Sequence, residues 1–198
     1  SAASDVYKRQ GMNNRGEIAP LARMARPHVA IITAIGTAHI GNLGSQEAIA
    51  EEKGDILLGV EPGGTAILPA DSPFLPLLLA RAKAARLGVL TFGESARAEI
   101  QLTDYVAGPD RGTARLLMDG LPLSVHLAAP GLHLALNACA VIAAVHALGG
   151  DVVAAAEALA TFGAPAGRGE RVTLALPGGE ALLIDDSYNA SPPRSGRL

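Results

Sequence analysis

The feature that most constrains the fold is an alternation of short apolar runs with longer helix-like segments in the first half of the chain. The apolar runs are Val29–Ile35, Thr65–Leu68 and Val89–Phe92, and they are rich in aliphatic and β-branched residues. Such runs are typical of strands that are buried on both faces of a parallel sheet. The alternation therefore predicts an α/β fold with a mostly parallel sheet and flanking helices.

The segments around these runs carry helix signals. Residues Gly16–Arg26 place apolar side chains at helical spacing, and Phe74–Leu87 is an Ala/Leu-rich segment that ends before Gly88. Ser45 is a suitable N-cap for a helix that would run toward Leu58. These segments supply the crossover connections that parallel strands need.

The pattern changes after residue 99. Three runs, Ile100–Val106, Thr113–Met118 and Leu121–Leu127, are separated by turn sequences that contain Gly, Pro and Asp. This spacing predicts an antiparallel patch. Two helices are expected after it, over His133–Leu148 and over Val152–Phe162, the second with Asp151 as its N-cap.

A Gly-, Pro- and Ala-rich stretch at Gly163–Gly169 indicates a linker between domains. Beyond it, Arg171–Leu176 and Ala181–Ile184 predict a hairpin that opens a second domain, and the chain ends too soon to complete one. At the other end, Ser1–Gln10 is a small polar string without periodicity, which we interpret as a non-native segment.

Composition excludes several classes of function. Aromatic residues make up only 3% of the 198 residues and the net charge is −3, so neither stacking platforms nor a basic field for nucleic acid is expected. No apolar run is long enough to span a bilayer and no signal peptide is seen, so we expect a soluble, cytoplasmic protein without membrane insertion. The single cysteine, Cys139, is interpreted as a small core residue.

Three features in the first half of the chain could carry chemistry. The string Gly11–Ile18 (GMNNRGEI) contains Asn13 and Asn14, whose amides could line a phosphate or peptide group, although a capped helix start explains it equally well. His39 follows the first strand, where it could ligate a metal or be merely solvated. Lys53 is one of only three lysines and lies beside two acids, which hints at amine chemistry, although an exposed helix lysine is the simpler interpretation.

Two further features remain open between a functional and a structural interpretation. The string Asp185–Pro193 (DDSYNASPP) follows an apolar strand, where paired acids and an amide could hold a ribose, a phosphate or a metal-bound water, or could form a polar turn. Asn137 lies in an otherwise apolar helix and is either a ligand contact or an exposed amide.

Taken together and in this order, six strings resemble the ATP-dependent Mur ligases of bacterial cell-wall synthesis. They are GMNNRGEI, IGTAHIGNLGS, IAEEKGDI, GLHLALNA, GRGER and DDSYNASP, and they cover residues 11–192. Within the family they are most similar to the ligases that add D-Ala-D-Ala to UDP-N-acetylmuramoyl-tripeptide. The resemblance implies these two substrates, ATP and Mg²⁺ as cofactors, and a monomeric enzyme that forms an acyl phosphate before the amide.

The resemblance also implies roles for individual residues. His39 would bind Mg²⁺, and Lys53 would be carbamylated to give an oxygen ligand of the kind that Mg²⁺ prefers. Asn13 and Asn14 would contact the substrate. The nucleotide would be bound by Asn137 at the adenine, Arg168 at the phosphates, Asp185 at the ribose, and Tyr188 and Asn189 in the same interdomain loop.

The sequence departs from the family pattern at several places. The Gly-Lys-Thr/Ser phosphate loop is missing, and Arg9 occupies the place of a metal-binding Glu. Ala34 and Leu134 each replace an expected Asn, and Arg194–Leu198 does not continue the usual pattern. We therefore expect residues 11–166 to be the central ATP-binding domain without its N-terminal part, residues 167–198 to begin the C-terminal Rossmann-like domain, and this piece alone to be inactive.

Two alternatives stay open from the sequence. A folylpolyglutamate-type ligase shares the central fold but should lack the GMNNRGEI and DDSYNASP strings in these forms. A non-catalytic nucleotide-binding module would explain the missing phosphate loop.

Overall fold

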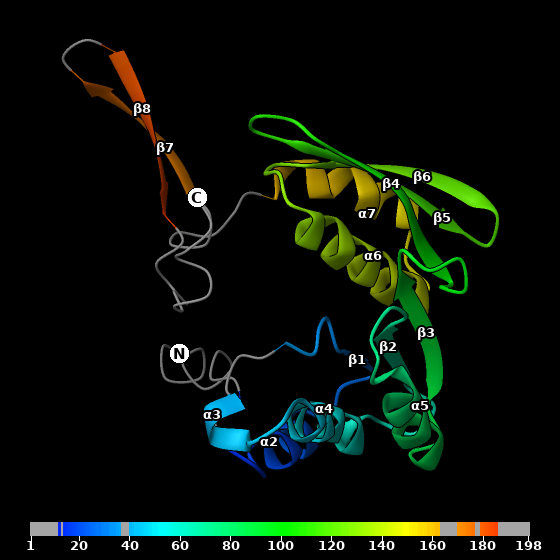
Figure 1. Cartoon of the computed structure of the whole chain (residues 1–198). Helices are drawn as coiled ribbons and strands as arrows, with labels where there is room; N and C mark the ends of the chain where they lie inside the picture. Colours follow the sequence, from blue (N-terminus) through cyan, green and yellow to red (C-terminus); the bar gives the residue numbers. More distant parts are fainter. Residues whose placement is uncertain (1–11, 13, 37–39, 163–169, 177–178, 186–198) are drawn as a thin grey trace.

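The structure, a computed structural model, describes residues 12, 14–36, 40–162, 170–176 and 179–185 (Figure 1). Six strands form one sheet in the order in which they occur along the chain. These strands are β1 (Val29–Ile31), β2 (Thr65–Pro69), β3 (Gly88–Gly93), β4 (Ile100–Ala107), β5 (Gly112–Met118) and β6 (Leu121–Leu127). The α/β class predicted from the sequence is confirmed, and the sheet is mixed.

The first four strands are parallel. Val29 of β1 pairs with Thr65 of β2, and Thr65 pairs with Gly88 of β3. β1 is shorter than the run Val29–Ile35 predicts, because only the Ile32 N–H continues the ladder beyond Ile31. The chain then leaves the sheet, and the prediction of a strand to residue 35 was wrong at its C-terminal end.

The antiparallel patch is confirmed, and it belongs to the same sheet. β5 and β6 are joined by a tight turn in which Asp119 and Gly120 have φ of 50° and 79°. Two successive residues with positive φ are characteristic of the hairpin turns that fit the twist of antiparallel strands. β4 contains an irregularity at Thr103, whose hydroxyl donates to the Arg115 carbonyl at 3.0 Å.

Helices cover both faces of the sheet (Figure 1). The two N-caps expected from the sequence are confirmed: the Ser45 Oγ accepts from the Ala48 N–H at 3.1 Å, and the Asp151 carboxylate accepts from two amides of its helix. The helices are α2 (Ile18–Ala25), α3 (Ile40–Leu43), α4 (Gln46–Gly54), α5 (Leu75–Ala84), α6 (Leu132–Ala147) and α7 (Val152–Ala158), with 3-10 turns η1 (Asp55–Gly59) and η2 (Leu159–Thr161).

Alternating side chains of the parallel strands enter two separate cores. Ile67 faces a core formed with α6, α7 and the antiparallel strands, whereas its neighbours Ala66 and Leu68 face a core formed with α5 and η1. Helix α6 contacts all six strands and so ties the parallel and antiparallel parts together. Cys139 on α6 is fully buried, which confirms its interpretation as a core residue.

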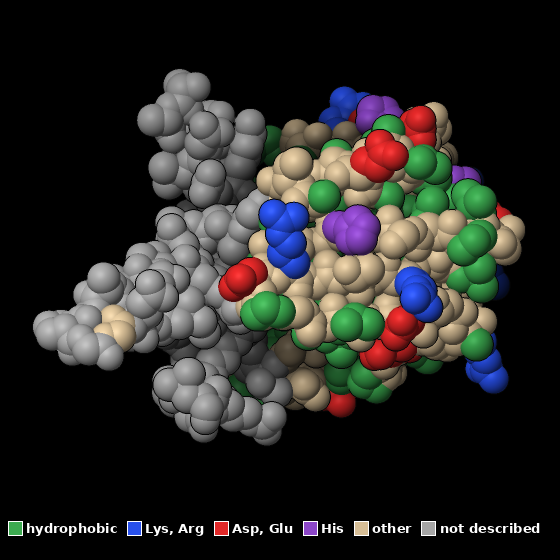
Figure 2. All heavy atoms as spheres, turned by 90° about the horizontal axis from the view of Figure 1, so that it is seen from above, with side chains coloured by type: hydrophobic (Ala, Val, Ile, Leu, Met, Phe, Trp, Pro, Cys, Tyr) green, Lys and Arg blue, Asp and Glu red, His purple; other side chains and the backbone are tan. Residues whose placement is uncertain are grey.

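The expected hairpin after the linker is present as β7 (Glu170–Leu176) and β8 (Gly179–Asp185), a separate two-stranded antiparallel sheet. The predicted linker at Gly163–Gly169 lies outside the described residues. Among the helices that are described, none has the length and apolar character needed to cross a membrane. Lys and Arg side chains are scattered singly over the face of the molecule seen in Figure 2.

Candidate functional site

Helix α4 carries two consecutive residues, Glu52 and Lys53, that contact two different loops. α4 begins at the Ser45 cap and has a low overall hydrophobicity, yet Ala48, Ile49 and Glu52 are all buried. These three positions share one helix face, because residues three and four apart on a helix are neighbours. Lys53 follows Glu52 directly, so its side chain points about 100° away from that face, and it is half-buried.

Lys53 reaches back to the end of the parallel sheet. Its Nζ donates to the carbonyl of Ala34 at 2.6 Å, three residues after the end of β1. Burial lowers the pKa of the Lys53 amine below its usual range, because removing the ammonium from water disfavours the charged form. The Lys53 amine is therefore fixed by a hydrogen bond and partly desolvated. It lies at the carboxyl end of a parallel strand, which is where open α/β sheets bind ligands.

Glu52 reaches the other way, to the start of α2. Only 4% of this residue is exposed, and its two carboxylate oxygens accept separate backbone N–H bonds. The Gly16 N–H donates to Oε2 at 2.7 Å and the Ile18 N–H donates to Oε1 at 2.9 Å. The sequence did not single out Glu52, although its spacing from Ala48 and Ile49 could have placed it on the buried face.

The GMNNRGEI string is a helix start in the described part. The Glu52 carboxylate accepts hydrogen bonds from the Gly16 and Ile18 amides at the start of α2, so these two amides are not available to a bound anion. Asn14 bonds to Glu17 through its backbone N–H at 3.2 Å and through its side-chain amide at 2.9 Å. Asn14 is exposed, and Asn13 lies outside the described residues.

A second carboxylate, Asp71, orders the carboxyl ends of β2 and β3. It accepts from the N–H groups of Glu94 and Ser95 at 2.7 and 2.9 Å. Gly93 has φ of 154°, and a Cβ added there would overlap the Asp71 carboxylate, so only glycine permits this approach. Sequence reasoning did not identify this contact, because it joins residues more than twenty positions apart.

The other predicted site residues are placed only in part. Asn137 lies on α6 with an exposed side chain, so it is available to a ligand and is not a buried amide. Asp185 is the last residue of β8, where its backbone pairs with Glu170. His39, Arg168, Tyr188 and Asn189 lie outside the described residues. The described part of the chain thus brings together Lys53 and the Asn14 loop, through α4, and leaves the remaining assignments untested.

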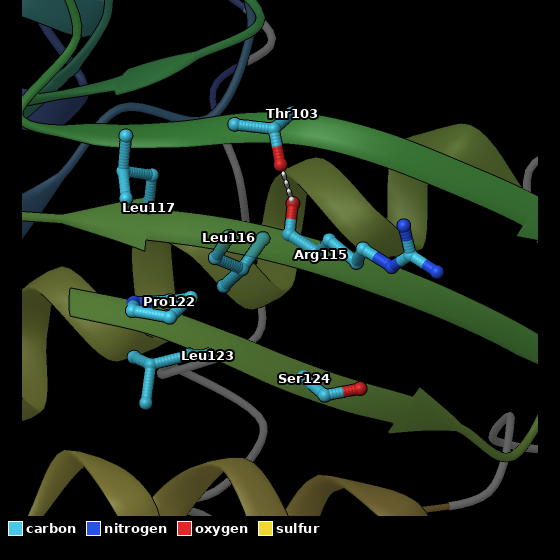
Figure 3. A pocket seen from close by; sticks show the side chains of 7 residues that line it. All are labelled: Thr103, Arg115, Leu116, Leu117, Pro122, Leu123 and Ser124. Atoms are coloured by element: carbon cyan, nitrogen blue, oxygen red, sulfur yellow. Dashed lines mark hydrogen bonds between the residues drawn. The ribbon is translucent and has the colours of Figure 1, made fainter. Parts of the chain in front are cut away.

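Among the described residues of the candidate site, Lys53 supplies an amine and the others supply hydrogen-bonding groups. In that part of the chain, no group of three His, Cys, Asp or Glu side chains is arranged to hold a metal ion. A pocket of about 320 Å³ lies on the antiparallel strands, lined by Thr103, Arg115, Leu116, Leu117, Pro122, Leu123 and Ser124 (Figure 3). It contains none of the site residues predicted from the sequence.

Comparison with known proteins gives a consistent result. Residues 10–145 match the family described as the Mur ligase middle domain. A UDP-N-acetylmuramoyl-tripeptide–D-alanyl-D-alanine ligase of Synechocystis is 37% identical over 182 residues, which cover 90% of this chain and 36% of that protein. A UDP-N-acetylmuramate–L-alanine ligase of Kineococcus radiotolerans is 35% identical, over 86% of this chain and 35% of that protein.

Solved structures show the same likeness. A crystal structure of MurF from Acinetobacter baumannii superposes with a TM-score of 0.84 at 31% identity, covering 93% of this chain and 39% of that one. The structure of a MurF ligase from Thermotoga maritima in complex with ADP gives 0.75 at 28% identity, covering 91% and 40%. The chain spans little more than a third of the length of these proteins.

Proposed function

The chain belongs to the Mur ligase family, and from that premise we propose that it is the central part of an ATP-dependent ligase that joins D-Ala-D-Ala to UDP-N-acetylmuramoyl-tripeptide. The proposed reaction belongs to bacterial peptidoglycan synthesis. ATP would phosphorylate the terminal carboxylate of the tripeptide, and the amine of D-Ala-D-Ala would attack the acyl phosphate, releasing phosphate and forming an amide. The likeness to the Synechocystis enzyme and to both MurF structures supports this choice of substrates.

The observation that carries the proposal is the environment of Lys53. A lysine that is neutral part of the time can attack carbon dioxide, lose a proton and become a carbamate, which replaces a positive charge with anionic oxygen atoms. The lowered pKa and the fixed position on the Ala34 carbonyl both favour that reaction. We assign Lys53 this role and assign His39 as its neighbour.

The nucleotide is proposed from the ADP complex of the Thermotoga relative. We assign Asn137 to the adenine through the family resemblance, and its exposed side chain on α6 leaves it accessible to a ligand. The remaining nucleotide contacts are proposed for Arg168, Asp185, Tyr188 and Asn189, and substrate contacts for Asn13 and Asn14. We also propose that residues 11–166 form the central domain and that residues from 167 onward belong to the next one.

The described residues do not by themselves form a site for Mg²⁺. Lys53 as an ammonium does not bind a cation, and in that part of the chain no group of three His, Cys, Asp or Glu side chains is arranged to hold a metal ion. Mg²⁺ is therefore proposed only through the resemblance, with the Lys53 carbamate and His39 as the residues that would hold it. No step of the reaction is derived through the metal.

The test is phosphate release by a longer polypeptide that joins this chain to the regions its relatives have. We expect release to require ATP, the UDP-linked tripeptide and D-Ala-D-Ala together. Release with UDP-N-acetylmuramate and L-alanine instead would move the assignment to the activity named for the Kineococcus relative. ATP binding without any release would favour the nucleotide-binding module.

A further inference from the structure

Glu52 has a role in the structure that the proposed function does not yet use. We propose that Glu52 is a positioning residue, which holds the loop of residues 14–18 on helix α4 and thereby fixes where Asn14 lies relative to Lys53. The inference rests on the proposed function, in which this loop contacts the tripeptide substrate and Lys53 belongs to the reaction centre. It adds a residue to that site which neither the sequence pattern nor the chemistry of ligation identifies.

The Glu52 carboxylate is buried. A carboxylate that is only 4% exposed is costly unless its oxygens are hydrogen-bonded. Both oxygens of Glu52 are satisfied, one by the Gly16 amide and one by the Ile18 amide, at 2.7 and 2.9 Å. Bonds from backbone amides to an ionised carboxylate are roughly twice as strong as bonds between neutral groups. The loop is therefore attached to α4 by two strong contacts that cannot slide independently.

The contacts of Glu52 and Lys53 point in different directions. Glu52 and Lys53 are adjacent in one helix, so the backbone between them is rigid and their side chains leave it about 100° apart. Glu52 holds the residue 14–18 loop, and Lys53 holds the chain after β1 through the Ala34 carbonyl. One helical turn thus sets the distance between two loops that are otherwise about twenty residues apart in sequence.

Asn14 is connected to Glu52 through the same loop. Glu17 fixes Asn14 inside the loop through its backbone and side-chain bonds. Glu52 fixes Gly16 and Ile18, which lie on either side of Glu17. A substitution at Glu52 therefore changes the position of Asn14 through this short segment. Glu52 itself touches no reacting group, and it acts through the loop.

The neighbouring Glu51 offers a matched control. It has the same chemistry and lies on the same helix, but its side chain is 49% exposed and pairs with Arg15 at a distance of 3.9 Å. Exposed pairs at this distance contribute little. Glu51→Gln should therefore leave both the loop and the reaction unchanged.

The experiment compares Glu52→Gln with Glu51→Gln in the longer ligase. Gln keeps the size of Glu but turns one acceptor into an NH₂ group that faces an amide donor. We expect Glu52→Gln to raise the exchange rates of the Gly16 and Ile18 amides at least tenfold. We also expect about a tenfold higher KM for the UDP-linked tripeptide, with kcat and the KM for ATP within twofold, because lost positioning of a binding loop weakens binding of the substrate. Circular dichroism of each variant before and after the assay checks that it stays folded.

The outcomes are distinct. Unchanged amide exchange in Glu52→Gln overturns the inference, and so does faster exchange with an unchanged KM, since Glu52 would then serve the fold alone. A fall in kcat with unchanged KM values for all substrates also overturns it, and so do the same effects in Glu51→Gln. A wild-type ligase that does not turn over these substrates overturns the proposed function first, and the positioning role with it, before any variant is measured.

Discussion

At the scale of single residues, partial burial of Lys53 favours the neutral form of its amine. Desolvation lowers the pKa of its amine, and the sign matters: the neutral form becomes more populated near neutral pH, and only the neutral amine attacks carbon dioxide. The Ala34 carbonyl accepts a hydrogen bond from Nζ and fixes the direction of the side chain. Carbamylation would change the charge of Lys53 from positive to negative. The side chain would then attract a cation bound to the phosphates, whereas the ammonium would repel it.

Lys53→Ala is predicted to abolish most turnover of the longer ligase while leaving it folded. The substitution removes one hydrogen bond of a half-buried side chain, which costs about 1 kcal/mol of unfolding free energy. Lys53→Arg should fail as well, because guanidinium stays protonated and cannot form a carbamate. The measurements are phosphate release and the carbamate signal in ¹³C NMR under ¹³CO₂.

Lys83→Ala is the control, because Lys83 is exposed on α5. Short carboxylic acids should partly restore Lys53→Ala by filling the vacated place. Near-normal turnover of Lys53→Ala without any additive would return Lys53 to the interpretation as a surface charge.

Cys139 shows the opposite effect of burial. Desolvation raises the pKa of its thiol to about 12, from a usual value of 9.0, so the thiolate is scarce in the folded protein. We predict no alkylation of native Cys139 by iodoacetamide at pH 8 and rapid alkylation in urea, measured by mass spectrometry. Because the folded pKa is raised, the contribution of this thiol to stability is full below pH 9 and is lost as pH rises toward 12. Modification of native protein at the unfolded rate would contradict the burial.

Residue-level prediction from the sequence succeeded where the residue type itself was unusual. Cys139 was identified as a core residue, which its burial confirms, whereas Lys53 stood out as one of three lysines and its role stays a prediction. Glu52 and Asp71 were missed, since acids in a helix and in a loop are usually solvated. Their importance comes from partners such as Gly16 and Glu94, which only the folded chain brings near.

At the scale of elements, starts were more predictable than ends. The caps at Ser45 and Asp151 are local, since each side chain bonds to amides two or three residues ahead. The end of β1 depends instead on residues distant in sequence. Its pairing with β2 ends at Ile31, and the Ala34 carbonyl accepts a hydrogen bond from Lys53. The helix predicted over Phe74–Leu87 is likewise shorter, at Leu75–Ala84.

The contact between α2 and η1 yields a prediction about stability. A Cβ at Gly59 would overlap the backbone of Ala22, and backbone cannot move aside as a side chain can. We predict that Gly59→Ala lowers the free energy of unfolding by roughly 2 to 3 kcal/mol, as overpacking does. Urea denaturation followed by circular dichroism measures the change.

Gly41→Ala serves as its control, because a Cβ there meets nothing within 4 Å. It should leave the unfolding midpoint nearly unchanged. Equal effects of the two substitutions would show that the close approach of η1 to α2 does not limit stability.

At the scale of the whole molecule, the parallel and antiparallel parts were both predictable, but their union was not. Each part has its own sequence pattern, whereas the join consists of two paired positions, Phe92 with Ile100 and Gly93 with Gln101. The short connection between β3 and β4 is held by the hydrogen bonds that the Glu94 and Ser95 amides donate to Asp71 and by the contact of Thr91 with Glu99. α6 then packs across both parts and makes them one body.

The last prediction concerns what this molecule can do by itself. Phosphoryl transfer depends on holding the phosphates in place, and the usual cradle is a Gly-rich loop with Lys and Ser or Thr. The 198 residues contain no such string, and the Gly16 and Ile18 amides already donate to Glu52 and cannot replace it. We predict that the 198-residue chain alone, mixed with ATP, the UDP-linked tripeptide and D-Ala-D-Ala, releases phosphate at the background rate, whereas the longer ligase turns over. Near-ultraviolet circular dichroism establishes that the short chain is folded in the same buffer. ATP-dependent product from the purified short chain would mean that its own residues suffice to hold the phosphates, and the candidate site would then have to be sought among residues other than those that α4 brings together.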